Sequence, residues 1–517
     1  MPTARVTADP SFVVGPINRR LFGSFIEHMG RAVYTGIYEP EHPTADEEGF
    51  RQDVIELVKE LGVTGIRYPG GNFVSGFHWR DGIGPKDQRP RRLSLAWRAT
   101  ETNQVGLHEF ASWVQKVDGE LMYAVNLGTA DTRDSLQVVE YANIPKGSTL
   151  ADERIANGRT SPFGIKMWYL GNEMDGPWQL GHSPADDYAK KASRTAKALR
   201  QLDPQVELVA SGSSHPTMPT FPYWDRVVLE HTYDDVDYIS CHGYYEEKNG
   251  DLGSFLAAPV KMDRYLDTVI ATADYVKAAK RSEKTLNISF DEWNVWYLGD
   301  NLRQFPRQAD RFYRTDEIEG NDWPEAPRLA EDVYSVADAV VVGGLLISLL
   351  RHADRVTSAS MSMLVNVIAP ITTEPGGPAW RQTTYYPFAV TSRLAAGVAL
   401  DVRVESGQYS TEELGSVPLV DAVATHDAEG GRAAVFLVNR SLAEEITVTV
   451  NVGALGNLSL LESHMISDPD VYARNTKDVP DRVRLKSNPT ASLANGVLTV
   501  TLPPVSWTAV ALSKPKA

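Results

Sequence analysis

Cysteine is almost missing from this 517-residue chain, and the single Cys241 cannot form a disulfide within it. Residues 1–25 lack the apolar core of roughly 7–15 residues that a secretion signal needs. The longest apolar run, residues 339–350, is shorter than the roughly 20 residues that span a bilayer, and it predicts a buried helix. These absences favour a cytoplasmic protein without a membrane partner.

Positive charge is also scarce: Lys and Arg number 51 against 67 Asp and Glu, which gives a net charge of −16. A surface this acidic repels nucleic-acid backbones and anionic lipids, so we expect no nucleic-acid partner. The 11 histidines form neither His-x-His nor His-Glu-x-x-His, and no Gly-x-x-x-x-Gly-Lys phosphate loop occurs. We therefore expect no metal and no cofactor.

Eight short apolar runs rich in β-branched or aromatic residues precede residue 400, and each is typical of a buried strand. Most are followed by a stretch with helical spacing of apolar residues. The predicted strands are residues 22–26, 63–68, 121–127, 166–170, 206–210, 238–242, 286–290 and 356–361. The predicted helices are residues 50–61, 108–117, 135–142, 186–202, 223–232, 262–279 and 331–350, with a closing helix from about Pro387 to Gly397.

This alternation of strands and helices predicts an α/β protein with a parallel sheet, and eight such units close most simply into a (β/α)8 TIM barrel. An open doubly wound sheet is the main alternative. That fold would favour a glycine-rich phosphate fingerprint after the first strand, and the residues Gly23-Ser-Phe-Ile-Glu27 do not form one.

From about residue 398 the pattern changes to short alternating runs separated by turn signals such as Gly430-Gly431. These runs predict a C-terminal all-β, jelly-roll-like sandwich over residues 398–517, next to a catalytic barrel over residues 17–397. Residues 4–12 alternate in the same way, so we expect residues 1–16 to contribute a strand to the sandwich. The alternating runs are residues 419–425, 433–438, 446–452, 496–502 and 506–512.

Two glutamates follow predicted barrel strands, Glu173 after the fourth and Glu292 after the seventh. The strand ends of a TIM barrel gather at one rim, so we expect these carboxyl groups to face each other across it. Acetal hydrolysis needs such a pair, because one acid protonates the leaving oxygen while the other attacks or activates water. A separation of roughly 5 Å implies retention of configuration, and about 6.5–9.5 Å implies inversion.

The neighbours of both glutamates suit a sugar. Asn172 places an amide beside Glu173, and Trp293 and Trp296 follow Glu292. Aromatic rings pack on the C–H face of a sugar and raise the pKa of a nearby carboxyl group by desolvation. Taken singly, a glutamate after a strand is more often a capping or solvated residue. A nucleophilic serine within residues 211–215 is disfavoured, because this run lacks the Gly-x-Ser-x-Gly pattern.

Five segments resemble the signatures of one enzyme family. Residues 168–179 (WYLGNEMDGPWQ) and 291–296 (DEWNVW) are similar to the two catalytic signatures of glycoside hydrolase family 51, the retaining α-L-arabinofuranosidases. Residues 22–38, 67–72 (RYPGGN) and 364–370 (LVNVIAP) match further signatures. The resemblance covers about residues 16–397 and extends more loosely into the C-terminal region.

The resemblance implies exo-acting hydrolysis of terminal α-L-arabinofuranosyl residues from arabino-oligosaccharides, with Glu173 as acid/base and Glu292 as nucleophile. Arg67 and Tyr244 match residues that hold the nucleophile ionised and oriented, and we expect His242 to support it through hydrogen bonds. The implied substrate-binding residues are Glu27, Asn72, Asn172, Tyr244, Trp97 and Trp296.

Two further expectations follow from the resemblance. Met363 stands where the family often has a glutamine that contacts the sugar, so this contact is expected to differ. Relatives in the family are often hexamers, and we expect a homo-oligomer here.

Without the resemblance, several of these residues have ordinary explanations. Glu27 and Arg67 could form a buried ion pair, and Asn72 could be a turn residue. Tyr244 and Trp97 could be core aromatics. Two other functions stay as alternatives: an endo-acting β-glucanase or xylanase on the same barrel, and a sugar-binding protein without activity.

Overall fold

The computed structural model describes residues 2–298 and 322–515. Parallel strands close into a barrel with the order β10-β11-β12-β3-β4-β7-β8-β9. Every predicted run overlaps one of these strands, so the (β/α)8 prediction is confirmed. The barrel strands are β3 (Gly23–Phe25), β4 (Gly65–Tyr68), β7 (Glu120–Val125), β8 (Met167–Leu170), β9 (Glu207–Ala210), β10 (Tyr238–Tyr245), β11 (Asn287–Val295) and β12 (Val356–Ser362).

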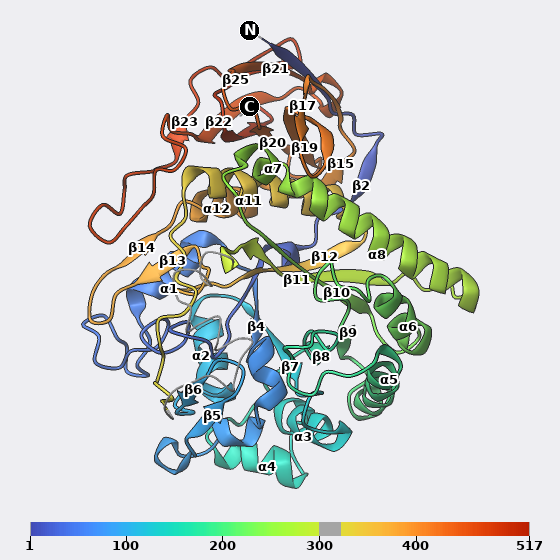
Figure 1. Cartoon of the computed structure of the whole chain (residues 1–517), viewed down its shortest axis with the longest axis vertical. Helices are drawn as coiled ribbons and strands as arrows, with labels where there is room; N and C mark the ends of the chain where they lie inside the picture. Colours follow the sequence, from blue (N-terminus) through green and yellow to red (C-terminus); the bar gives the residue numbers. More distant parts are fainter. Residues whose placement is uncertain (1, 299–321, 516–517) are drawn as a thin grey trace.

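Helices cover the outside of the barrel (Figure 1). The predicted ones are all present: α1 (Gln52–Leu61), α2 (Leu107–Lys116), α3 (Thr132–Asn143), α5 (Ala185–Leu202), α6 (Tyr223–Thr232), α8 (Ala258–Lys280), α11 (Val336–Arg351) and α12 (Tyr385–Leu394). Helices α4 (Thr149–Ala156) and α7 (Leu252–Leu256) were not predicted. In α4 only Ala151 and Arg154 are buried, so this helix has no apolar stripe to detect.

Helix α1 shows how the local sequence sets a boundary. Its buried positions form one face that packs on the barrel, and Gly62 ends the helix in the left-handed region at φ 77°. The Gly62 N–H donates to the carbonyl oxygens of Val58 and Lys59, which satisfies groups that the helix end leaves free. Glycine suits this position because it adopts positive φ without steric cost.

The apolar run 339–350 lies in α11, and every residue from Val336 to Leu350 is buried. Ser335 begins the helix in a capping box: its hydroxyl accepts from the Asp338 N–H, and the Asp338 carboxylate accepts from the Ser335 N–H. The helix lies between the barrel and the C-terminal sheets, where it contacts β11 on one side and β19 (Val420–Asp427), β20 (Arg432–Asn439) and β26 (Ser506–Ser513) on the other (Figure 1). Because α11 has partners on both sides, it needs no polar face. No helix among the described residues is long and apolar enough to cross a membrane.

The C-terminal region consists of two sheets with mostly antiparallel pairing. One has the order β16-β1-β21-β25-β24 and the other β2-β15-β19-β20-β26-β22-β23. The N-terminal strand β1 pairs in parallel with β21 and antiparallel with β16, so the first residues of the chain lie inside the first sheet (Figure 1). The strands are β1 (Thr3–Thr7), β2 (Val13–Pro16), β15 (Val398–Leu400), β16 (Arg403–Glu405), β19 (Val420–Asp427), β20 (Arg432–Asn439), β21 (Ile446–Asn451), β22 (Ser459–Ile466), β23 (Lys486–Ser487), β24 (Ser492–Ala494), β25 (Val497–Leu502) and β26 (Ser506–Ser513).

In the described part of the chain, three two-stranded hairpins lie outside the barrel and the sandwich, and none was predicted. Each has strands of only three or four residues, too short for an alternating pattern. The hairpins are β5 (Arg92–Ser94) with β6 (Ala99–Glu101), β13 (Ile371–Thr373) with β14 (Ala379–Arg381), and β17 (Gln408–Thr411) with β18 (Gly415–Pro418).

The close contact between α11 and β26 gives a first testable prediction. A Cβ added at Gly343 would lie 2.2 Å from Cδ1 of the buried Trp507 ring. We expect Gly343→Ala to lower the free energy of unfolding by about 1–3 kcal/mol, although alanine is favoured within a helix by about 1 kcal/mol. Thermal unfolding checks this. Gly453→Ala is the control, because its nearest contact would be 3.6 Å away, and equal midpoints for the two variants would contradict the prediction.

Candidate active site

Glu173 and Glu292 lie in one pocket at the carboxyl end of the barrel. Glu173 follows β8, and Glu292 belongs to β11. Both are buried, with 8% and 6% of their surface exposed. A carboxylate oxygen of each and a ring nitrogen of His242 all lie within 4.8 Å of one another. The structure therefore brings together the two carboxyl groups that are 119 positions apart in the sequence.

The backbone before Glu173 is unusual. Gly171 and Glu173 both have positive φ, 87° and 44°. A glutamate in this left-handed region is held there only when its surroundings compensate for the strain, and such residues cluster at functional sites.

Strand β11 is longer than predicted and carries a bulge. The sequence predicted its end at Phe290, but it pairs with β10 as far as Val295, so the expectation that Glu292 follows the strand is wrong. Its register shifts against both β10 and β12 between Ser289 and Trp293, where β11 contains one extra residue. A bulge interrupts the alternation of side chains, and here Asp291 and Glu292 both contact Arg67 inside the barrel.

Arg67, in β4, is 1% exposed and links the strands of the pocket. Its Nη1 donates to Glu292 Oε1 at 2.7 Å and its Nη2 donates to Asn172 Oδ1 at 2.6 Å. Its Nε lies 3.2 Å from Asp291 Oδ2. The guanidinium is thus directed at Glu292 and Asp291 and not at Glu27, in contrast to the Glu27–Arg67 ion pair considered from the sequence.

His242 lies in β10 and contacts both glutamates. Its Nδ1 is 2.9 Å from Glu173 Oε1 and 3.5 Å from Glu292 Oε2, and its Nε2 is 3.4 Å from Asp291 Oδ2. Burial lowers the pKa of His242, but the charges of Glu292 and Asp291 outweigh this and raise the pKa well above its usual value. A protonated imidazole therefore sits against three carboxyl groups.

Glu27 is held by two donors. Its Oε1 accepts from the Phe73 N–H at 2.7 Å and from Trp97 Nε1 at 2.8 Å. Burial raises the pKa of Glu27 to about 7, although the hydrogen bond from Phe73 opposes this rise. Trp97, one of the substrate-binding residues that the resemblance implies, is only 5% exposed and acts here as a hydrogen-bond donor.

Asn172 and Asn72 contact each other beside Gly71. Asn172 Nδ2 donates to Asn72 Oδ1 at 3.2 Å, while the Asn172 oxygen accepts from Arg67. Gly71 leaves room between them and the acids: an added Cβ would lie 2.9 Å from Glu292 Oε1 and 3.2 Å from Glu27 Oε2. Only glycine fits at this point without displacing a carboxylate.

Tyr244, Trp296 and Met363 complete the pocket. The Tyr244 hydroxyl donates to Glu292 Oε2 at 2.7 Å and lies 2.8 Å from Ser362 Oγ. Its ring meets Trp296 edge-on, with centroids 5.0 Å apart. Met363 lines the same pocket, so the position where the family often has glutamine presents a thioether here.

Three contacts could not be assigned from the sequence. Trp178 Nε1 donates to Glu173 Oε2 at 2.7 Å, and its ring stacks on His215 with centroids 6.0 Å apart. The Asp291 carboxylate lies against the Arg67 guanidinium, and the Ser362 hydroxyl lies against the Tyr244 hydroxyl. Trp178 and Asp291 both lie within the quoted signatures, which was the only available signal, but the motif does not show where their side chains point.

The two glutamates differ in pKa. Burial raises the pKa of Glu292, but the charges of His242 and Arg67 and the Tyr244 hydroxyl outweigh burial and bring the pKa below its usual value. Burial also raises the pKa of Glu173; the hydrogen bond from His242 offsets this only in part, and the charge of Glu292 adds to the rise. One ionised and one protonated acid is the division of roles that acetal hydrolysis requires.

The donors of the pocket do not suit a metal. Within the described part of the chain, Glu173, His242 and Glu292 are the only group of potential ligands close enough to share an ion. A ligating histidine must be neutral, whereas the pKa of His242 is raised. The Arg67 guanidinium already contacts Glu292 at 2.7 Å, so a divalent cation would add positive charge beside two existing cations.

The serines of residues 211–215 are structural. The Ser213 hydroxyl donates to Asp225 Oδ2 and the Ser214 hydroxyl to Asp175 Oδ1, each at 2.8 Å. His215 Nδ1 instead lies 2.7 Å from Thr217 Oγ1. Ser213 and Ser214 therefore bond to carboxylates, Ser211 accepts from the Met174 N–H, and no serine–histidine pair forms.

A buried pair of carboxyl groups with opposite pKa shifts, at the mouth of a (β/α)8 barrel and surrounded by amides and aromatic rings, defines a glycoside hydrolase. The separation, within 4.8 Å, corresponds to the retaining class.

Comparisons with known proteins agree. Residues 57–251 match the family model of the α-L-arabinofuranosidase 1 domain, and residues 291–506 match that of the α-L-arabinofuranosidase C-terminal domain. An exo-α-(1→6)-L-arabinofuranosidase of Bifidobacterium longum is 54% identical over 98% of this chain and 97% of its own. An intracellular exo-α-(1→5)-L-arabinofuranosidase of Streptomyces lividans is 53% identical over 100% of this chain and 76% of its own.

A solved structure of a family 51 α-L-arabinofuranosidase from Bifidobacterium longum has a TM-score of 0.93 and 44% identity, and the match covers 99% of both chains. The chain belongs to the α-L-arabinofuranosidases of glycoside hydrolase family 51. The resemblance noted in the sequence is thereby confirmed.

The space beside Gly71 gives a second prediction. We expect Gly71→Ala to lower kcat/KM on an aryl α-L-arabinofuranoside by about 100-fold, because the methyl group displaces the carboxylates of Glu292 and Glu27. The thermal midpoint of each variant is also measured, so that a loss of folding is told apart from a loss of activity. Gly253→Ala is the control, since its nearest contact would be 3.5 Å away and outside the pocket. Parent-like activity of Gly71→Ala would refute the steric account.

The hydrogen bond from Tyr244 predicts a shift in the pH profile. In the roles that the sequence predicts, Glu292 attacks in its ionised form and Glu173 donates a proton, so activity is expected to be lost as the pH falls through the pKa of Glu292 or rises through the pKa of Glu173. Tyr244→Phe removes a donor to Glu292 and raises its pKa. We therefore expect the acid limb of kcat/KM to move to higher pH. A pH–rate profile measures this, and an unmoved acid limb would count against the assignment.

Proposed function

We infer that this chain is an exo-acting enzyme that releases terminal α-L-arabinofuranosyl residues from arabino-oligosaccharides with retention of configuration. The observation that carries this is the approach of Glu173 and Glu292 to within 4.8 Å, with one pKa raised and the other lowered. The relatives named exo-α-(1→6)- and exo-α-(1→5)-L-arabinofuranosidase support the exo mode, and neither name indicates endo action.

In the first step, the ionised Glu292 attacks the anomeric carbon and the bond to the leaving oxygen breaks. Glu173 gives its proton to that oxygen, so the leaving sugar departs as a neutral alcohol. Arg67 and His242 keep Glu292 ionised before attack, and Tyr244 orients it. The product of this step is a covalent arabinosyl ester on Glu292.

In the second step, Glu173 is ionised and takes a proton from water as the water attacks the anomeric carbon. The ester bond to Glu292 breaks, arabinose leaves, and both glutamates return to their starting states. His242 contacts both carboxyl groups, and this position lets it balance the negative charge as it moves from one to the other.

Substrate binding is assigned to the remaining residues of the pocket. The carboxyl group of Glu27 and the amides of Asn72 and Asn172 suit sugar hydroxyls, while Trp97 holds Glu27 in place. Trp296 offers an apolar face. Glu27, Asn72, Trp97 and Trp296 line one small space together with both glutamates, which suits a single terminal sugar.

The location and assembly of the protein are also proposals. Relatives from Streptomyces lividans and Bacillus subtilis are named intracellular, and we propose the same for this chain, which would then act on imported oligosaccharides. A homo-oligomer, expected to be a hexamer, is testable by light scattering.

The two glutamates can be told apart by azide. We expect Glu292→Ala to abolish turnover of an aryl α-L-arabinofuranoside, and azide to restore it with inversion, because azide attacks once from the side of the missing carboxylate. Glu173→Ala should lower turnover of substrates with poor leaving groups by about 10²–10⁴-fold, and azide should yield the retained product, because it attacks the ester. The anomeric configuration is read by NMR. Exchanged product configurations would reverse the two roles, and normal turnover by Glu292→Ala would end the proposal.

A further inference from the structure

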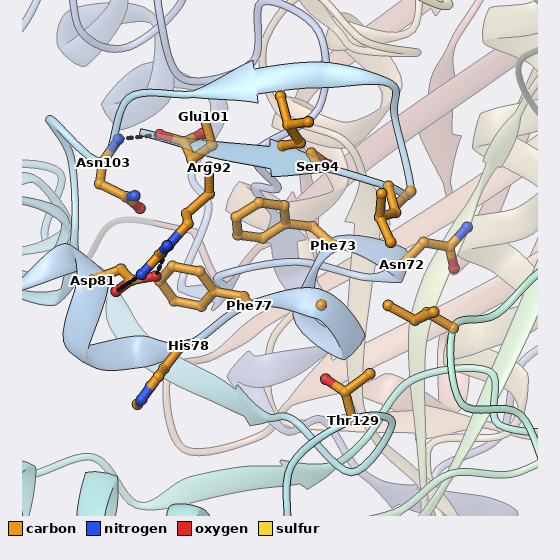
Figure 2. Close-up of a pocket in the computed structure, with 15 residues that line it drawn as sticks. Asn72, Phe73, Phe77, His78, Asp81, Arg92, Ser94, Glu101, Asn103 and Thr129 are labelled. Carbon is orange, nitrogen blue, oxygen red and sulfur yellow. Dashed lines mark hydrogen bonds and ion pairs between the residues drawn. The ribbon is translucent and has the colours of Figure 1, made fainter. Parts of the chain in front are cut away.

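A hollow of about 360 Å³ lies beside the catalytic pocket. Asn72 lines both spaces. Figure 2 shows the rings of Phe73 and Phe77 beneath the β5–β6 hairpin, which contributes Arg92 and Ser94, with Thr129 on the opposite wall. Asn72, which is proposed to bind the terminal sugar, therefore also borders this second space.

This hollow continues into another of about 390 Å³. The two share Gly76, Phe77, His78 and Thr129, and the second extends to Asp131 and Asp134. Each volume falls within the range of ligand sites, roughly 300–1,000 Å³. Together they form a groove, here called the Phe77 groove, which leads from Asn72 away from the two glutamates.

The lining of the Phe77 groove suits a neutral sugar chain. Phe77 presents a half-buried ring at its centre, where the C–H face of a pentose can pack. The Arg92 side chain pairs with Asp81 at 2.8 Å and 3.2 Å, so its charge is already balanced while its remaining N–H groups can donate to hydroxyls. With the acids Asp131 and Asp134 at the far end, the groove disfavours an anionic sugar.

The groove also lies on the side of the proton donor. The loop after Glu173 first brings Trp178 against the Glu173 carboxylate at 2.7 Å and then places Leu180 in the wall of the groove. The acid/base faces the leaving oxygen, so the leaving chain emerges beside this loop.

We propose that the Phe77 groove binds the part of a neutral pentosyl oligosaccharide beyond the bond that is cleaved. This inference rests on the proposed function and adds to it a binding site for the leaving chain. The groove makes the enzyme prefer oligosaccharides of several residues over substrates with a short leaving group.

The test fills the groove without touching the catalytic pocket. A Cβ added at Gly76 would contact only Leu180 Cδ2, at 3.3 Å, so the side chain of Gly76→Leu extends into the groove, while Gly76→Ala is the matched small variant. Phe77→Ala removes the ring, and Tyr275→Ala, which removes a 59% exposed ring on α8, is its control. The substrates are a linear α-(1→5)-linked arabinopentaose and an aryl α-L-arabinofuranoside.

We expect Gly76→Leu and Phe77→Ala to lower kcat/KM on the pentaose by about tenfold, and to change it less than about twofold on the aryl substrate. The parent should also show a lower KM for the pentaose than for the biose, and Gly76→Leu should lose this difference. Parent-like kinetics on the pentaose in a folded Gly76→Leu variant would overturn the inference. Equal losses on both substrates would also count against it, because a short aryl group does not reach the groove. Failure of the parent to cleave either substrate would instead refute the proposed function.

Discussion

The buried guanidinium of Arg67 is the charge on which the pocket depends. Four acids, Glu27, Glu173, Asp291 and Glu292, lie within or directly beneath a small space from which water is largely excluded. Carboxylates that are buried together cannot all be ionised unless cations neutralise them. Arg67 contacts two of the four, and a protonated His242 contacts three. Because arginine does not lose its proton in proteins, this positive charge stays beside Glu292 whatever the protonation states of the neighbouring acids.

The asymmetry of the two glutamates follows from the same arrangement. Both are equally buried, so burial alone would raise both pKa values. The Glu292 carboxylate is in contact with Arg67, His242 and Tyr244. The Glu173 carboxylate is in contact with His242 and with Trp178, which is an uncharged donor. The β11 bulge makes this possible, since without it Asp291 and Glu292 would lie on opposite faces of the strand.

The barrel and the pair of catalytic glutamates could be predicted from the sequence. The β11 bulge and the directions of several side chains could not, for physical reasons. The barrel strands are buried on both faces, so their sequences are continuous apolar runs. The sequence of α11 is a continuous apolar run for the same reason. The pairing of Glu173 with Glu292 follows from the rule that strand ends share a rim. The β11 bulge could not be predicted, because it is a mismatch between strands and leaves no pattern in one of them. The inward position of Trp97 depends on a hairpin whose strands have three residues each. Side-chain directions in loops, such as that of Trp178, are likewise set by tertiary packing.

Strand β1 occupies the middle of a sheet, between β16 and β21, although its partners are encoded almost at the other end of the chain. At 5–20 residues per second, a ribosome needs roughly 20–90 s to reach β21 after β1 has emerged. Until β16 has been synthesised the first strand has no neighbour to bond with, and the edge that pairs with β21 stays available to other nascent chains until β21 follows. Synthesis therefore runs nearly to completion before this sheet can close. Trimming the first residues would leave two new open edges in the finished protein, not merely a shorter end.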